Sequence, residues 1–224
     1  TIASVNMSLG GGSNAGNRDS DPRKTVIDQL KAAGVATVIA SGNSSFTNAV
    51  GAPGCISTAV TVGSTTKSDV ISSFSNSSPV VDLLAPGSSI NSSVPGGGYS
   101  FFNGTSMAAP HVAGAFAAIR SRIPSATVDQ IESALKSTGT PVTDTRTGGT
   151  QTKPRIRVDL ALSQLLAVAG PQLTVTPSGN FASSGNVGGP FSPTSTTFTV
   201  QNSGSGTLNW TASSSNTGVA TVSP

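Results

Sequence analysis

The chain has 224 residues, which is enough for one large domain or for a large domain and a small one. Only 9% of the residues are charged and the formal net charge is +3, so nucleic-acid binders, coiled coils and acidic tails are poor interpretations. No apolar run approaches the length of about 18 residues that a membrane span needs. We therefore expect neither a nucleic-acid nor a membrane partner.

The charged side chains are confined to one part of the sequence. All of them fall between Arg18 and Asp159, and residues 160–224 carry none. This change in composition predicts a mixed globular domain at residues 1–169 and a neutral accessory module at residues 170–224. The chain begins without Met or a signal-peptide pattern and ends within strand-like sequence, so we expect a fragment of a longer protein.

The first predicted element is an apolar strand over residues 2–9, which runs into glycines and a polar loop. A helix is expected next, with Asp21 as its cap and Pro22 in its first position. An apolar strand follows over residues 35–41. Strand, helix and strand form a βαβ unit, which predicts a parallel sheet covered by helices. Further short strands are expected over residues 59–63 and 80–84.

The second half predicts two more helices and then a change of period. Residues 105–123 are apolar nearly all round, which indicates a helix buried inside the domain. Thr127 and Gln130 predict a capping box for the next helix. Beyond residue 170 the period becomes two, as in an antiparallel β-sandwich, but the remaining length holds only three or four strands. These strands are expected near residues 173–176, 197–200 and 208–212.

The predicted fold class is therefore α/β. A parallel sheet with helices on both faces forms the first domain, and a partial antiparallel β-sandwich follows it. The single cysteine, Cys55, cannot form a disulfide within this chain.

The stretch NGTSMAAPHVAG, residues 103–114, contains the strongest candidate nucleophile. Ser106 lies where a glycine-containing loop meets the N-terminus of the predicted buried helix. Its hydroxyl is expected beside free backbone N–H groups and the positive end of the helix dipole. That position suits a nucleophile whose attack creates an oxyanion. On this local argument alone, a serine that caps an ordinary helix is the alternative.

A second candidate is Asn43, in the stretch SGNSS. It follows the C-terminal end of a predicted parallel strand, where open α/β sheets bind their ligands. Its side-chain amide is a neutral donor that can stabilise developing negative charge. The alternative is an asparagine in an ordinary turn.

Together these stretches resemble the subtilisin-like serine protease (subtilase) family. GTSMAAPHVAG is similar to the family's serine motif, and SLGG, VIASGNS, TAVTVGS and VVDLLAPG occur in family order within residues 2–166. The resemblance implies a subtilisin-like fold, with Ser106 as nucleophile and Asn43 with the Ser106 backbone N–H as oxyanion hole. It implies that an extended peptide substrate pairs with Ser8, Leu9 and Gly10. It also implies that the pocket for the residue before the scissile bond is lined by Ala40, Ser41 and Gly42.

The chain departs from the family pattern because it contains no histidine suited to act as the general base. Its only histidine, His111, lies five residues after Ser106 on the same predicted helix, displaced along the axis by about 7.5 Å, so it has no in-line approach to the hydroxyl. In subtilisin the triad order is Asp, His, Ser, so both partners are expected upstream of Thr1. We expect the isolated chain to have little or no activity of its own.

The leading hypothesis is the C-terminal part of a secreted, monomeric serine endopeptidase that acts on proteins or peptides. The alternative is a non-catalytic member of the family that binds peptides or adheres to surfaces. The chemistry requires no cofactor. Some subtilases place a structural calcium ligand at the position of Asp82, and Asn17, Asp19 and Asp21 are a second, weaker calcium candidate. The residues after 170 resemble immunoglobulin-like or BACON-type modules of secreted bacterial enzymes.

Overall fold

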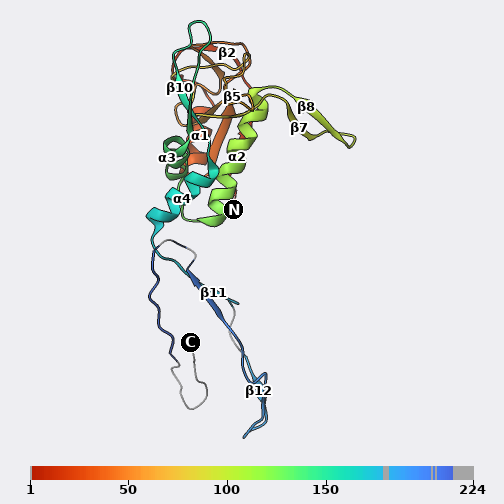
Figure 1. The fold of residues 1–224 in the computed structure, drawn as a ribbon, viewed down its shortest axis with the longest axis vertical. Helices are drawn as coiled ribbons and strands as arrows, with labels where there is room; N and C mark the ends of the chain where they lie inside the picture. Colours follow the sequence, from red (N-terminus) through yellow and green to blue (C-terminus); the bar gives the residue numbers. More distant parts are fainter. Residues whose placement is uncertain (1, 179–181, 203, 205, 214–224) are drawn as a thin grey trace. The chain divides into compact units, whose positions relative to one another are not determined.

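The computed structural model of the chain describes residues 2–178, 182–202, 204 and 206–213. The chain divides into two compact units, Thr1–Leu165 and Leu166–Pro224, and each is considered by itself (Figure 1). The division falls within the last helix, α4 (Val158–Ala169). Among the described residues, no helix combines the length and the apolar character needed to cross a membrane.

A six-stranded sheet forms the centre of the first unit. Its order is β1-β3-β5-β6-β10-β9, in which the first five strands run parallel and β9 pairs antiparallel with β10. The chain is therefore mixed α/β with a mostly parallel sheet, as the βαβ pattern predicts. The strand bounds are β1 (Ser4–Met7), β3 (Ala36–Ala40), β5 (Val60–Thr65), β6 (Leu83–Pro86), β9 (Thr140–Thr143) and β10 (Thr152–Arg155).

Helices cover both faces of this sheet. Successive strand residues point to opposite faces, so Met7 and Ser4 of β1 face opposite sides. Met7 packs against the cluster that contains Ile27 of α1 (Lys24–Ala32). The Ser4 hydroxyl donates a hydrogen bond to the Ala113 carbonyl of α2 (Thr105–Arg122) at 2.9 Å. Helices α1 and α2 thus lie on opposite faces, as Figure 1 shows on either side of β5.

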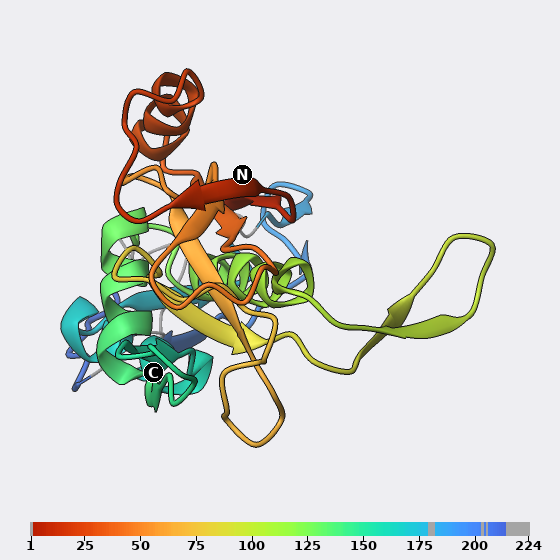
Figure 2. The same cartoon turned by 90° about the horizontal axis from the view of Figure 1, so that it is seen from above.

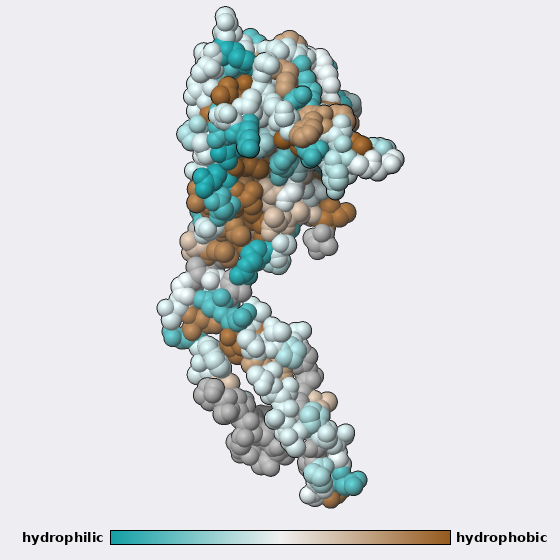
Figure 3. Space-filling model, turned by 45° about the vertical axis from the view of Figure 1, so that its right-hand side comes forward, coloured by the Kyte–Doolittle hydropathy of each residue, from teal (hydrophilic) through white to brown (hydrophobic). Residues whose placement is uncertain are grey.

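Helix α2 begins at the predicted residue and ends one residue before the predicted end, but it is not buried all round. It packs along β1, β3, β5 and β6. Val112 and Phe116 are fully buried on that side, whereas Gly114, Ala117 and Ala118 are exposed on the other. The prediction of complete burial is wrong for the described residues because nothing among them covers the outer side. On the face of the first unit that Figure 3 turns to the reader, hydrophobic residues lie at the surface between hydrophilic ones.

The predicted start of the first helix is also wrong. Helix α1 begins at Lys24, and the cap position is held by Arg23, which makes no side-chain cap bond. Asp21 instead accepts hydrogen bonds from the Arg23 backbone N–H at 3.0 Å and from its guanidinium at 2.7 and 2.8 Å. The carboxylate pairs with a guanidinium two residues away, and the chain makes a turn before the helix starts.

The capping box of the next helix, α3 (Val128–Thr138), is confirmed. The Gln130 N–H donates to the Thr127 hydroxyl at 3.2 Å, and the Thr127 N–H donates to the Gln130 side chain at 2.9 Å. Each residue thus satisfies a backbone donor that the helix itself leaves free.

Three antiparallel pairs were not expected from the apolar pattern. Besides β9 with β10 in the central sheet, β2 (Gly11–Asn14) pairs with β4 (Val50–Ala52), and β7 (Ile90–Ser93) pairs with β8 (Tyr99–Phe102). The β7–β8 hairpin projects from the body of the unit and leads into α2 (Figures 1 and 2). Because it projects, Tyr99 and Phe101 are 76% and 68% exposed.

The second unit contains two separate two-stranded antiparallel sheets among its described residues. β11 (Leu173–Thr176) pairs with β14 (Thr199–Asn202), and β12 (Ser184–Gly185) pairs with β13 (Phe191–Ser192). The strand expected near residues 208–212 does not form, and Trp210 there is 44% exposed. Residues 179–181 and 214–224 of the expected module lie outside the described residues. The β-sandwich therefore stays a prediction.

Candidate active site

Ser106 is the second residue of α2, and its side chain meets the segment that follows β1. The Ser106 hydroxyl donates a hydrogen bond to the Ser8 carbonyl at 3.2 Å. The Ser8 hydroxyl donates to the Ser106 carbonyl at 2.7 Å. Ser106 is therefore half-buried at the N-terminus of a helix, where the dipole favours developing negative charge.

Asn43 lies beside the same helix terminus. Its side-chain oxygen accepts hydrogen bonds from the Thr105 N–H at 2.9 Å and from the Thr105 hydroxyl at 2.8 Å. These two bonds fix the amide plane. The amide nitrogen has no protein acceptor within the described part of the chain, so it can donate to a ligand.

The two candidate oxyanion donors converge on one place. A Cβ atom built on Gly104 would lie 3.3 Å from the Asn43 amide nitrogen and 3.6 Å from the Ser106 backbone nitrogen. Glycine at this position places no side-chain atom between the two donors, and the Met107 sulfur lies 3.6 Å from the same point. Two N–H donors near one point, next to a hydroxyl, are what stabilisation of a tetrahedral oxyanion requires.

The structure also brings together the two segments expected to bind substrate. Residues 8–10 connect β1 to β2, and Leu9 is 52% exposed. Ala40 ends β3 and is buried together with Ser41. A Cβ on Gly10 would lie 3.7 Å from the Ala40 carbonyl oxygen, so the two segments run close to each other. Gly42 connects this strand end to Asn43.

His111 is exposed on α2, and its Nδ1 hydrogen-bonds the Met107 carbonyl oxygen of the same helix at 2.8 Å. No hydrogen bond joins it to Ser106, in agreement with the helical spacing. Since it is the only histidine in the sequence, these 224 residues provide no imidazole positioned to deprotonate Ser106.

The two calcium candidates have their carboxylate oxygens engaged by protein donors. Asp82 accepts from the Lys136 ammonium at 2.7 Å and from the Thr61 N–H at 2.8 Å. Asp19 accepts from the Ser57 N–H at 3.0 Å and the Ser57 hydroxyl at 2.7 Å. The described residues hold no cluster of three or more histidine, cysteine or acidic side chains suited to a metal. Calcium binding stays a prediction.

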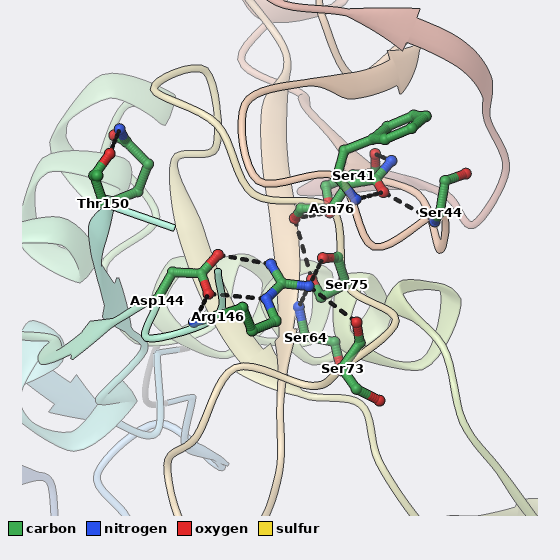
Figure 4. A network of polar contacts seen from close by, with 11 residues as sticks. Ser41, Ser44, Ser64, Ser73, Ser75, Asn76, Asp144, Arg146 and Thr150 are labelled. Carbon is green, nitrogen blue, oxygen red and sulfur yellow. Dashed lines mark hydrogen bonds and ion pairs between the residues drawn. The ribbon is translucent and has the colours of Figure 1, made fainter. Parts of the chain in front are cut away.

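A polar network that contacts Ser41 and Ser44, on either side of Asn43, was not predicted from the sequence (Figure 4). It contains Asn76, which is 2% exposed, and the ion pair of Asp144 with Arg146. Burial raises the pKa of the Asp144 carboxyl, but the hydrogen bonds and charge of Arg146 more than offset this and hold it below its ordinary value. These three polar residues come from two loops far apart in the sequence and give no local signal, so only the fold brings the loops together.

The family assignment comes from the sequence as a whole. Residues 3–154 match the model of the subtilase family. The chain belongs to the subtilase family. In this subtilase chain the matched span covers the whole site, from Ser8 through Asn43 to Ser106, and also Arg146.

Alignment with individual subtilases shows how much of their length this chain covers. The chain is 42% identical over 139 residues to subtilisin E of Bacillus subtilis (strain 168), an alignment that covers 61% of this chain and 35% of that protein. It is 43% identical over 145 residues to alkaline serine exoprotease A of Vibrio alginolyticus, covering 63% of this chain and 26% of that protein. The alignment thus spans about a third or less of each relative.

Solved structures agree with the fold of this subtilase chain. A cold-adapted subtilisin-like serine proteinase matches with a TM-score of 0.57 and 39% identity over 67% of this chain and 53% of that one. A protease of Pseudoalteromonas arctica matches with a TM-score of 0.63 and 32% identity over 72% of this chain and 51% of that one. The chain therefore spans about half of each structure.

Proposed function

We propose that this chain carries the nucleophile and oxyanion hole of a serine endopeptidase. The Ser106 oxygen attacks the carbonyl carbon of a peptide bond and gives its proton to a base. The Asn43 amide and the Ser106 backbone N–H hold the resulting oxyanion. The C–N bond then breaks, the amine leaves with that proton, and water hydrolyses the acyl-enzyme. The observation that carries this proposal is the convergence of both donors beside Gly104.

We propose that the base and its orienting carboxylate lie on residues outside these 224. Three observations support this. The β1 strand occupies an edge of the sheet with one side unpaired, and the outer side of α2 exposes Gly114, Ala117 and Ala118 next to it. The subtilases that match this chain are two to four times longer than the matched part. An added strand and helix would complete the sheet and cover α2.

The segments around Ser106 suit an extended peptide substrate. Residues 8–10 belong to no strand, so their backbone groups can pair with a substrate chain by β-augmentation. The pocket-lining candidates Ala40, Ser41 and Gly42 carry no charge, which favours an apolar residue before the scissile bond.

The test uses the longer protein that contains this chain and a p-nitroanilide peptide with an apolar residue before the scissile bond. Ser106→Ala is expected to abolish turnover because it removes the attacking oxygen. Ser121→Ala is the matched control, since Ser121 lies exposed on the same helix and its hydroxyl bonds only the Ala118 carbonyl. This control should keep full activity. Turnover that survives in Ser106→Ala would rule out the assignment.

A further inference from the structure

Arg146 connects two loops that are distant in sequence. Its guanidinium pairs with Asp144, whose side chain is fully buried, through hydrogen bonds of 2.8 and 2.6 Å. Its remaining nitrogen donates to the Ser75 carbonyl at 2.7 Å and to the Ser73 carbonyl at 3.0 Å. The ion pair on the loop between β9 and β10 thus holds the segment 73–75 by its backbone, as Figure 4 shows.

Asn76, the next residue, holds the loop that carries Asn43. Its side-chain oxygen accepts from the Ser44 N–H at 2.9 Å and the Phe46 N–H at 3.2 Å. Its side-chain nitrogen donates to the Ser41 carbonyl at 3.0 Å, and its backbone N–H donates to the Gly42 carbonyl at 2.9 Å. Asn76 therefore contacts the backbone on both sides of Asn43.

The two loops pack closely at Gly42. Gly42 has a φ of +105°, and a Cβ there would lie 2.4 Å from the Asn76 side-chain nitrogen. On the other side, the Gly42 N–H donates to the Thr105 hydroxyl at 3.1 Å, and Asn43 binds Thr105 directly. The Asn43 loop is thus fixed between Asn76 and the N-terminus of α2.

We propose that Arg146, held by Asp144, is a positioning residue for the oxyanion hole. It fixes the segment 73–76, and through Asn76 it sets the place of the Asn43 amide relative to Ser106. This inference rests on the function proposed above and names a residue that hydrogen-bonds Asp144 and the backbone of Ser73 and Ser75, not Ser106 or Asn43. Because a misplacement of about 1 Å can cost on the order of 100-fold in rate, such a tether affects turnover without touching the substrate.

The experiment measures kcat and KM of the active, longer protein with Arg146→Met, with Asn43→Ala and with both changes. Arg146→Met is expected to lower kcat about 10- to 100-fold and to leave KM within about threefold. In the Asn43→Ala variant no amide remains to be positioned. Adding Arg146→Met to this variant should therefore lower kcat by less than about threefold. If Arg146→Met does not fold, the cycle uses Arg146→Lys, which keeps the charge beside Asp144 but loses the paired hydrogen bonds.

Arg155→Met is the matched control. Arg155 pairs with Asp69 by two hydrogen bonds and binds the Ile156 carbonyl, and it is 21% exposed against 20% for Arg146. None of these partners contacts the Asn43 loop, so its kcat should stay within about twofold of the parent. If Arg146→Met lowers kcat by the same factor in the parent and in Asn43→Ala, or in neither, the positioning role is overturned. Loss of the Asn43→Ala effect itself would instead contradict the proposed function.

Discussion

At the scale of single residues, the account depends on the Asn43 amide. Asn43→Ala in the longer protein is expected to lower kcat by about 100- to 1,000-fold, with a small change in KM, because the donor acts on charge that develops only in the transition state. Steady-state kinetics measures both constants. Asn48→Ala, an exposed asparagine in the same loop region, should leave both unchanged. A raised KM with unchanged kcat would assign Asn43 to substrate binding instead.

The Asp21 carboxylate is expected to make the stability of the domain depend on pH in the acid range. Hydrogen bonds from the Arg23 side chain and backbone lower the pKa of Asp21 from an ordinary 3.8 to about 2. The folded state therefore holds this proton less tightly than the unfolded state, and the stabilisation is present above about pH 4 and lost as the pH falls through about 2.

Asp21→Asn tests this contribution by urea unfolding at several pH values. The difference in unfolding free energy between the parent and the variant is expected at pH 6 and should shrink between pH 4 and pH 2. Asp129→Asn is the control: it also removes one negative charge and one ion pair, that with Lys31 at 2.7 Å, but its side chain is 73% exposed. A difference that does not change with pH would contradict the role of the Asp21–Arg23 pair.

At the scale of elements, α3 offers a clean measurement of local stability. Thr127→Ala removes the hydroxyl that accepts from the Gln130 N–H and should destabilise the domain by about 1 kcal/mol. Chemical denaturation provides the value, and Ser125→Ala, an exposed serine just before the helix, should change it by less than about 0.5 kcal/mol. An equal loss in both variants would mean that the capping box adds nothing.

The elements that sequence reasoning found are those with strong local signals. Strands β1, β3, β5 and β6 lie in largely apolar runs, α2 follows a long run of small apolar residues, and Thr127 with Gln130 form a recognisable cap. Strands β9 (TPVT) and β10 (TKPR) give no such signal and were not predicted. Helix α1 was misplaced at its start because Asp21 looks like a cap until its pairing with Arg23 is known. The β7–β8 hairpin was missed because its strands are polar in part and its pairing depends on a turn of three glycines, Gly96–Gly98, each with positive φ.

The residues of the candidate site also differ in whether the local sequence reveals them. Ser106 and Asn43 lie in stretches whose local sequence suggests a helix terminus and a strand end. Asn76 and Arg146 have no such context, since each acts on a backbone segment more than thirty residues away in the chain. Only the folded arrangement shows that they hold the loop of Asn43.

At the scale of the whole molecule, the first unit has the subtilase fold and carries a proposed site whose base and orienting carboxylate lie outside these 224 residues. The proposed nucleophile Ser106, the two proposed oxyanion donors and residues 8–10 lie together at the carboxyl ends of β1 and β3. Their only imidazole, that of His111, hydrogen-bonds the Met107 carbonyl oxygen and makes no hydrogen bond to Ser106. The account therefore requires that Ser106 becomes reactive only in the longer protein.

Covalent labelling of that longer protein with a fluorophosphonate tests this claim most directly, because the reagent reacts with an activated serine. After digestion, mass spectrometry locates the adduct. The account predicts one adduct per molecule, on the peptide that contains Ser106, and no adduct in Ser106→Ala. No adduct on the folded parent protein, or an adduct on another serine, would contradict it and favour a family member that binds peptides without cleaving them.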